Sequence, residues 1–318
     1  MTSQALERRA SDHFVGRERE LAELSGALAE APAGRGRTFL ISGEPGIGKT
    51  RLMNEVSRFA AERGIRTVWG RCWEGEGAPA YWPWIQVIRS LVASLNPADR
   101  ESVLESEAAA PMVQTIARIV PDLLAAAPRA IRPPQAGADS AQTQFRLFDS
   151  VAGLLREIAR QGPIAILLDD LHDADTASLT MLRFVAREST GVGILIIGTY
   201  RDQEVQRAPV LSQLIGDLGR EARSLPLAGL SPDEIAQLYD EVVGRPADAA
   251  TVEKLHQATA GNPLFVDGIV RGLIAQRDQG HDIAALESLS APHTIREAIA
   301  RRLRKLSDDA RAALEVAA

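Results

Sequence analysis

The sequence predicts an α/β fold in which helices flank a parallel sheet, and two stretches lead to this prediction. Residues Gly43–Thr50 read GEPGIGKT and match the phosphate-loop pattern G-x-x-x-x-G-K-[ST]. Five consecutive apolar residues, Ile164–Leu168, run directly into Asp169 and Asp170, as expected of a central strand covered on both faces. Together they predict a P-loop nucleoside-triphosphatase domain with a five-stranded parallel sheet.

The phosphate loop lies between a predicted strand, Thr38–Ser42, and an amphipathic helix that follows Thr50. Its glycines allow a sharp turn that points successive backbone N–H groups at a polyphosphate. Lys49 is expected to reach the β- and γ-phosphates of ATP, and the Thr50 hydroxyl is expected to ligate Mg²⁺. The loop is therefore the predicted centre of nucleotide binding.

The two carboxylates after Leu168 match a Walker B pattern at the C-terminal end of a strand, where open α/β sheets bind ligands. Asp169 is expected to hold Mg²⁺, commonly through water, and Asp170 to orient or deprotonate the attacking water. His172 is interpreted as a neighbouring loop residue, and Asp175 as the N-cap of the next helix.

Three further strands complete the predicted sheet: Arg66–Gly70, Val192–Thr199 and Ser224–Ala228. The second of these, Val192–Thr199, is followed by Tyr200 and then Arg201. An arginine just past the C-terminal edge of a central strand lies near the γ-phosphate in this fold class. Arg201 is therefore predicted to sense whether ATP or ADP is bound.

Residues 72–161 are predicted to form a helical insertion between the second and third strands, with helix over 84–127 and an exposed, proline-rich loop over 128–140. The tryptophans gather around its start: Trp69, Trp73, Trp82 and Trp84. Base stacking on single-stranded nucleic acid is one interpretation of this stretch. Packing within the insertion is favoured, because Glu74 and Glu76 would repel phosphates.

Length and composition set broad limits. At 318 residues, with 45% hydrophobic and 25% charged residues, the chain is expected to form about two globular domains. No apolar run approaches the ~20 residues of a membrane span, and Met1–Asp12 is too polar for a secretory signal. Cys72 is the only cysteine, which excludes an internal disulfide and a cysteine zinc site. We expect a cytoplasmic protein without a membrane partner, and the net charge of −6 argues against a chain dominated by nucleic-acid binding.

From Leu230 onward the sequence is predicted to be helical, with Ser231 as an N-cap and Pro232 at a first helical position. A helix over about 295–306 carries a basic face, which we interpret as solvated rather than DNA-reading. The last residues, Ser307–Ala318, read as a helix without a stop signal. We therefore expect this sequence to be the N-terminal part of a longer protein.

Several motifs together resemble one family, the signal-transduction ATPases with numerous domains (STAND). The closest similarity is to the ATPase module of large LuxR-type bacterial transcriptional regulators and of related cyclase or kinase fusions. The motifs occur in the family's order: Val15-Gly16-Arg17-Glu18, the phosphate loop, Leu168-Asp169-Asp170-Leu171-His172, Gly198-Thr199-Tyr200-Arg201-Asp202 and Gly261-Asn262-Pro263-Leu264. Asp173 departs from the pattern, because many relatives carry an aromatic residue there.

The resemblance implies roles for individual residues. Val15, Gly16 and Arg17 would line the adenine pocket, and Pro263 would close it from a helical lid domain. The other expected nucleotide contacts are those of the phosphate loop and its successor: Gly43, Glu44, Pro45, Gly46, Ile47, Gly48, Lys49, Thr50 and Arg51. The implied organisation is a flexible tail over 1–12, a nucleotide-binding domain over 13–228, a helical lid over 229–288 and the start of a winged helix over 289–318.

The resemblance also implies a function. The expected activity is a slow, Mg²⁺-dependent ATP hydrolysis that switches a larger regulatory protein between ADP and ATP states. The expected partners are the nucleotide, further copies of the protein in the ATP state, and an unknown inducer. DNA is expected to be contacted only through a C-terminal domain outside this chain. The alternative is an AAA+ motor or loader acting on DNA, since origin-recognition ATPases share the Gly-Arg-Glu motif. That alternative requires an arginine finger supplied in trans, for which Arg220 and Arg223 are candidates.

Overall fold

A computed structural model describes residues 14–75, 77–106, 109–127 and 140–278. The chain forms two compact units. One unit holds residues 18–44 and 49–227, and it is called the sheet unit below. Among the described residues, the other groups 14–17 with 45–48 and 228–278, and it is called the helical unit. The predicted N-terminal tail and winged-helix start lie outside the described residues.

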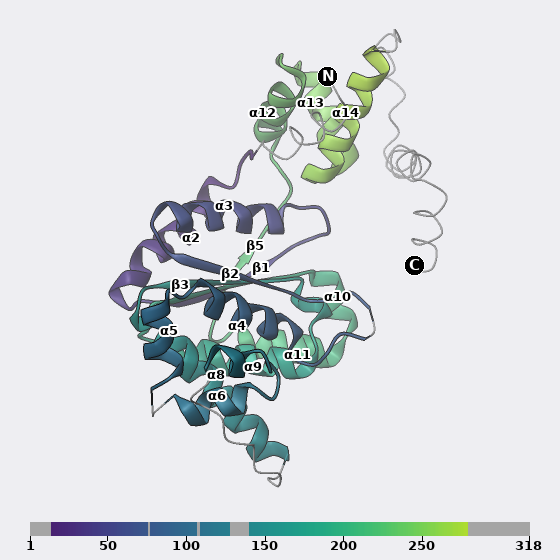
Figure 1. Cartoon of the computed structure of the whole chain (residues 1–318). Coiled ribbons are helices and arrows are strands. Elements are labelled where there is room, and N and C mark those ends of the chain that lie inside the picture. The colour runs from purple at the N-terminus through teal and green to yellow at the C-terminus, as the bar shows by residue number, and fades with distance from the viewer. Residues whose placement is uncertain (1–13, 76, 107–108, 128–139, 279–318) are drawn as a thin grey trace. The chain divides into compact units, whose positions relative to one another are not determined.

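The sheet unit is built on five parallel strands in the order β2-β3-β4-β1-β5 (Figure 1). Their bounds are Arg37–Ser42 for β1, Arg66–Arg71 for β2, Ile164–Asp169 for β3, Ile194–Tyr200 for β4 and Arg223–Pro226 for β5. The predicted five-stranded parallel sheet is thus confirmed. β4 begins two residues later than predicted, because the chain turns at Gly193 and the Val192 carbonyl accepts from Gly36 and Ile194 instead.

The register fixes which residues meet at the C-terminal edge of the sheet. β1 pairs with β4 so that Ser42 lies opposite Tyr200, and β3 pairs with β4 so that Leu168 lies opposite Gly198. β4 therefore separates the strand that precedes the phosphate loop from the strand that ends at Asp169. β3 is buried at every position, as its apolar run predicts for a strand covered on both faces.

Helices cover both faces of this sheet (Figure 1). The helices α2 (Glu18–Glu30) and α3 (Lys49–Glu62) lie on one face, and α4 (Trp82–Ser94), α8 (Ser140–Arg160) and α9 (Thr176–Glu188) on the other. The remaining helices of the sheet unit are short: η1 (Ala31–Ala33), α5 (Pro97–Leu104), α6 (Ala110–Ile116), α7 (Leu123–Ala126), η3 (Leu171–Asp173), α10 (Asp202–Arg207) and α11 (Pro209–Leu218).

The predicted insertion is helical, but the stretch 84–127 is divided into four helices. Proline interrupts it: Asn96 caps α5 by accepting from the Asp99 N–H, and Pro97 occupies the first turn. The predicted proline-rich loop lies outside the described residues except for Ser140, which begins α8.

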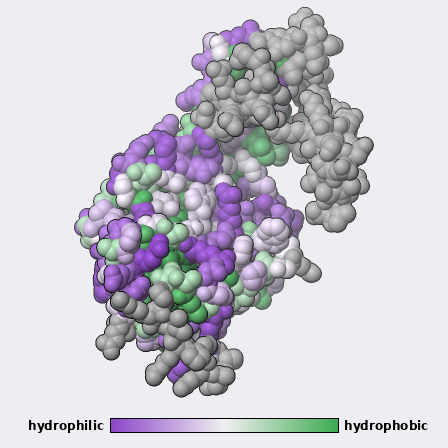
Figure 2. All heavy atoms as spheres, viewed as in Figure 1, coloured by the Kyte–Doolittle hydropathy of each residue, from purple (hydrophilic) through white to green (hydrophobic). Residues whose placement is uncertain are grey.

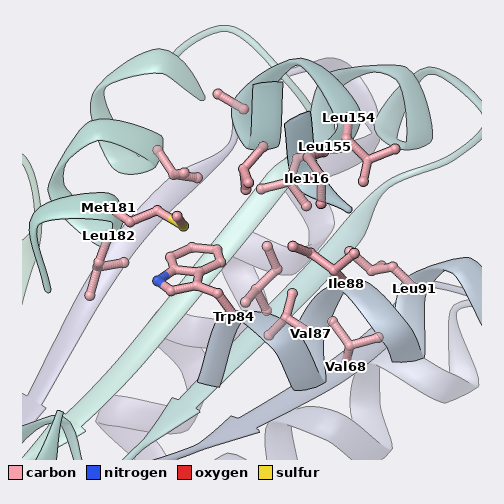
Figure 3. Close-up of a cluster of buried hydrophobic side chains, with 14 of the residues drawn as sticks. Val68, Trp84, Val87, Ile88, Leu91, Ile116, Leu154, Leu155, Met181 and Leu182 are labelled. Atoms are coloured by element: carbon pink, nitrogen blue, oxygen red, sulfur yellow. The ribbon is translucent and has the colours of Figure 1, made fainter. Parts of the chain in front are cut away.

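The core of the insertion surrounds Trp84, which is fully buried (Figure 3). Its indole Nε1 donates to the Ser178 carbonyl of α9 at 3.0 Å, and Val68 and Met181 belong to the same cluster. Packing, as predicted, therefore explains this tryptophan. The prediction was wrong for Trp73, which is 58% exposed in the loop before α4, because no helix or strand there carries it into the core.

The helical unit contains α12 (Pro232–Val243), α13 (Ala249–Thr259) and α14 (Pro263–Asp278). Ser231 and Glu234 form a capping box at the start of α12, and Pro232 follows the cap, as the sequence predicts. The apolar core of this unit includes Ile235, Leu255 and Val266. Val15 from the N-terminal segment is buried in the same core.

The molecular surface in Figure 2 mixes hydrophilic and hydrophobic residues, as is usual for a globular protein. Among the described residues, no helix has both the length and the apolar character needed to span a bilayer.

Candidate active site

The phosphate loop uses its glycines where other residues would be strained. Gly43, Gly46 and Gly48 have φ angles of 150°, 80° and 102°, a region that residues with a Cβ rarely adopt. Gly46 also has no room for a side chain, because an added Cβ would lie 2.8 Å from the Cβ of Leu264. The backbone conformation of the loop therefore requires glycine at these three positions, whose spacing identified the motif.

Lys49 begins α3 and its side chain is buried. Its ammonium donates to the Gly43 carbonyl at 2.8 Å and to the Glu44 carbonyl at 3.0 Å. Burial lowers the pKa of Lys49, and the nearby carboxylate of Asp170 acts in the opposite direction. The ammonium is thus held by weak, neutral acceptors in a place where a phosphate would be a stronger, charged partner.

The side chains of Thr50, Asp169 and Thr199 meet at the ends of three different elements. The Thr50 hydroxyl donates to the Asp169 carboxylate at 3.0 Å, and the Thr199 hydroxyl donates to its Oδ1 at 2.6 Å. Asp169 and Thr199 are both buried. The sequence predicted Thr50 and Asp169 as Mg²⁺ ligands, and in the structure their side chains lie within hydrogen-bonding distance.

These oxygens fit a magnesium site of the kind that is completed by substrate. Mg²⁺ in phosphoryl-transfer sites takes one or two protein oxygens and fills its remaining positions with phosphate and water. Thr50 and Asp169 supply such a pair. Within the described residues there is no group of three or more His, Cys, Asp and Glu side chains that could hold a metal without other ligands.

Asp170 lies just past the end of β3 in a left-handed conformation, with φ of 58°. Aspartate tolerates this region better than most residues, at a cost of roughly 1 kcal/mol or more. Its N–H donates to the Thr199 hydroxyl at 3.0 Å, which holds the strained peptide in place. The carboxylate is 38% exposed, so water can reach the group that is predicted to act on water.

The sequence did not single out Thr199, although it bonds both Walker B aspartates. A hydroxyl-bearing residue that ends an otherwise apolar stretch, Ile194–Ile197 followed by Gly198, was the available signal. Its partners could not be inferred, because they depend on the pairing of β3 with β4.

His172 was interpreted as a neighbouring loop residue, and it lies in the short turn between β3 and α9. The residue lies in the 3-10 turn η3, and its imidazole is buried, with Nε2 3.5 Å from Asp173 and 3.9 Å from Asp170. Burial lowers the pKa of His172, which favours the neutral ring at pH 7. Asp175 caps α9 as predicted, by accepting from the Ser178 N–H at 2.9 Å.

Arg201 follows β4 at the edge where Lys49 and Asp170 lie, and its charge contributes to lowering the pKa of Lys49. This is the position that the sequence predicted, and its sensor role stays a prediction. Arg51 forms an ion pair with Glu55 at 3.0 Å on α3, so its predicted contact with nucleotide also stays a prediction.

In the helical unit, the motif residues contact the tip of the phosphate loop. The Arg17 guanidinium donates to the Ile47 carbonyl at 3.1 Å and to the Ala228 carbonyl at 2.6 Å. The Asn262 amide donates to the Pro45 carbonyl at 2.9 Å. Pro263 is the first residue of α14. The predicted adenine contacts of Val15, Gly16, Arg17 and Pro263 are not tested by these positions, and the sequence had given Asn262 no role.

Comparison with known proteins agrees with this geometry. The family described as AAA ATPase domain matches residues 13–197, which is more than half of the chain. An uncharacterized protein of Rhizobium meliloti (strain 1021) is 20% identical over 288 residues, covering 88% of this chain. The chain spans 27% of the length of that relative.

Two solved structures are similar to this chain. The Aeropyrum pernix ORC2 protein, in ADPNP-ADP complexes, is 16% identical with a TM-score of 0.50, and the match covers 94% of this chain and 75% of that one. A STAND protein with a tetratricopeptide repeat sensor from Pyrococcus horikoshii is 19% identical with a TM-score of 0.47, covering 81% of this chain and 30% of that one. At 16% identity, the likeness to the Aeropyrum pernix protein concerns the fold alone.

Proposed function

Since this chain belongs to the AAA ATPase domain family, we propose that it is a regulatory switch that binds ATP with Mg²⁺ and hydrolyses it slowly. The observation that best supports the proposal is the convergence of Lys49, Thr50, Asp169 and Thr199 at the C-terminal edge of the sheet. A charged donor, a hydroxyl and a buried carboxylate beside a glycine loop are the parts that phosphoryl transfer requires.

Each part has a task that its surroundings support. Lys49 exchanges the Gly43 and Glu44 carbonyls for the β- and γ-phosphate oxygens of ATP. Thr50 and Asp169 hold Mg²⁺, which when bound neutralises charge that develops on the phosphate oxygens. Asp170 orients or deprotonates the attacking water from its exposed position after β3.

Slow turnover suits a switch, because the protein then stays in its ATP-bound or ADP-bound conformation for a long time instead of cycling continuously. A ligand shifts a conformational equilibrium only by the difference between its affinities for the two states. In the proposed cycle ADP favours a resting form, and ATP together with an inducer favours a self-associating form. Arg201 is the proposed group that distinguishes the two nucleotides, because it follows β4 near Lys49 and Asp170.

The alternative is an ATPase motor or loader that acts on DNA. Arg220 and Arg223 are the candidates for the finger that this alternative requires. Each pairs with a carboxylate, Arg220 with Asp217 and Arg223 with Glu23, and Arg220 is the more exposed, at 79% against 57%. This alternative predicts ATP hydrolysis that rises with protein concentration and is stimulated by DNA.

The first test is to denature the purified protein and separate the released nucleotide by chromatography. Near-stoichiometric ADP would support a switch held in its product state. An empty site, followed by steady turnover that DNA accelerates, would contradict the switch and favour the motor. Lys49→Ala serves as the control in both assays, because the substitution removes the only charged donor that the loop itself provides.

A further inference from the structure

We propose that Arg17 and Asn262 are positioning residues that hold the phosphate loop from its outer side and aim its N–H groups at phosphate. Through them the helical unit controls whether the loop is competent to bind. The inference rests on the proposed nucleotide switch, and it assigns these two residues a task other than contact with adenine.

Three consecutive carbonyls of the loop are engaged. The Pro45 carbonyl accepts from the Asn262 amide at 2.9 Å, and the Gly46 carbonyl accepts from the Leu264 N–H at 3.4 Å. The Ile47 carbonyl accepts from the Arg17 guanidinium at 3.1 Å. All donors and acceptors belong to the helical unit, which includes residues 45–48.

Because the peptide unit is planar, these contacts to the carbonyls also determine where the loop N–H groups point. In a trans peptide the C=O and the following N–H point in opposite directions within one plane. Fixing the carbonyls of Pro45, Gly46 and Ile47 therefore fixes the N–H directions of Gly46, Ile47 and Gly48. A phosphate loop binds its anion through such N–H groups. Glycine peptides rotate easily, so an unsupported loop would sample many orientations that cannot bind.

Asn262 is built into its position. It is 2% exposed, and its Oδ1 accepts from the Leu264 N–H at 3.2 Å while its amide nitrogen donates to Pro45. Its own carbonyl accepts from Phe265 and Val266 in the first turn of α14. The side chain that holds the loop is thereby fixed to the start of a helix.

Arg17 has equally little freedom. It is 8% exposed and adopts a left-handed conformation with φ of 68°, which is unusual for arginine and persists only where surrounding contacts enforce it. One guanidinium nitrogen joins the Ile47 carbonyl to the Ala228 carbonyl, where the chain enters the helical unit. Movement of that entry segment would therefore be transmitted to the loop.

Binding and helix position are then linked in both directions. If phosphate binds better when the three carbonyls are held, bound phosphate must favour the held arrangement by the same factor. An inducer that displaces the start of α14 would release the Pro45 and Gly46 carbonyls and promote nucleotide exchange. This is a regulatory connection within the proposed switch, made by two named side chains.

The test compares Asn262→Ala and the charge-conserving Arg17→Lys with wild type, using two ligands in isothermal titration calorimetry. Inorganic tripolyphosphate reports on the loop alone, and ATP reports on the loop and the base together. A positioning role predicts that each variant weakens both ligands by the same factor, roughly fivefold to tenfold for one lost hydrogen bond. Asn96→Ala and Arg271→Lys are matched controls. The first removes the N-cap of α5 and the second alters the ion pair with Asp267, and neither should change the affinity for either ligand.

Hydrogen exchange of the ligand-free protein gives a second measurement that requires no nucleotide. In both variants the peptide covering residues 43–50 should exchange faster, while peptides from α12 and α13 stay unchanged. Weaker ATP binding with unchanged tripolyphosphate binding and unchanged loop exchange would assign these residues to the adenine pocket and overturn the proposal. Equal ATP affinity in wild type and Lys49→Ala would instead refute the nucleotide switch itself, so the two failures are distinguishable.

Discussion

Replacing Thr199 with valine removes one hydroxyl from the centre of the site and changes little else. Valine has nearly the same shape and suits a strand. The substitution deletes the 2.6 Å bond to Asp169 and the 3.0 Å bond from the Asp170 N–H. Because Thr199 has 0% exposure, water cannot replace the lost hydroxyl without a rearrangement of the strand ends.

The expected cost follows from these two bonds. A hydrogen bond to a charged group contributes about 1.5–3 kcal/mol, and an N–H left without its partner adds about 1 kcal/mol or more. We therefore expect the free energy of unfolding of the sheet unit to fall by roughly 2–4 kcal/mol. For a unit of this size each kcal/mol lowers Tm by about 2–4 °C, so the midpoint should fall by roughly 5–15 °C. ATP turnover should fall as well, because the strained Asp170 peptide loses its anchor.

Thermal unfolding followed by circular dichroism measures this prediction, together with steady-state ATP hydrolysis at a temperature where all variants are folded. Thr199→Ser keeps the hydroxyl and should recover most of the stability. Thr38→Val is the matched control, since Thr38 is a buried threonine of β1 for which the described residues show no side-chain hydrogen bond. If Thr199→Val unfolds no earlier than this control, or if Thr199→Ser unfolds as early as valine, the hydroxyl network does not hold the site together.

Four further outcomes are expected. Lys49→Ala should weaken ATP binding by roughly 30- to 100-fold, as loss of a charged hydrogen bond implies, and near-normal affinity in calorimetry would contradict its role. Asp170→Asn should leave ATP affinity within about twofold of wild type and slow hydrolysis by roughly 10²–10⁴-fold, as removal of a general base does; unchanged turnover would exclude this group. Trp84→Ala should cost about 3–5 kcal/mol in urea unfolding, because it empties the centre of the insertion core and removes the indole bond to the Ser178 carbonyl. Burial raises the pKa of Cys72, so the reactive thiolate is scarce at pH 8; alkylation by iodoacetamide should be slow in the folded protein and fast in denaturant, and equal rates would refute this.

The sheet and the phosphate loop could be predicted because their signals are local. The GEPGIGKT stretch dictates its own backbone, since three of its residues need φ angles that glycine adopts readily. The five apolar residues Ile164–Leu168 predicted a strand covered on both faces, because they lie between helical segments and are followed directly by two carboxylates. The N-caps at Asp175 and Ser231 were predictable for the same reason, because a cap and its helix are neighbours in sequence.

The parts that escaped prediction depend on residues that are distant in sequence. The bonds of Thr199 require β4 to lie beside β3, and the bond of Asn262 to Pro45 joins opposite ends of the chain. The burial of the His172 side chain was not predicted, because a short 3-10 turn has no periodicity to show which side chain faces inward. Trp73 was misjudged because aromatic residues usually mark a core, and composition alone does not separate a loop from a helix.

The strand order has a consequence for synthesis of the protein on the ribosome. β1 pairs only with β4 and β5 among the described strands, and Arg37 of β1 lies opposite Leu195. At about 5–20 residues per second, β1 must wait roughly 10–30 s before its first partner has been made. During that interval β2 and the insertion can associate locally, but the apolar residues of β1 and the phosphate loop after it have no sheet to join. Nucleotide therefore cannot assist the early stages of folding, and we expect the nascent N-terminal part to be the segment that chaperones protect.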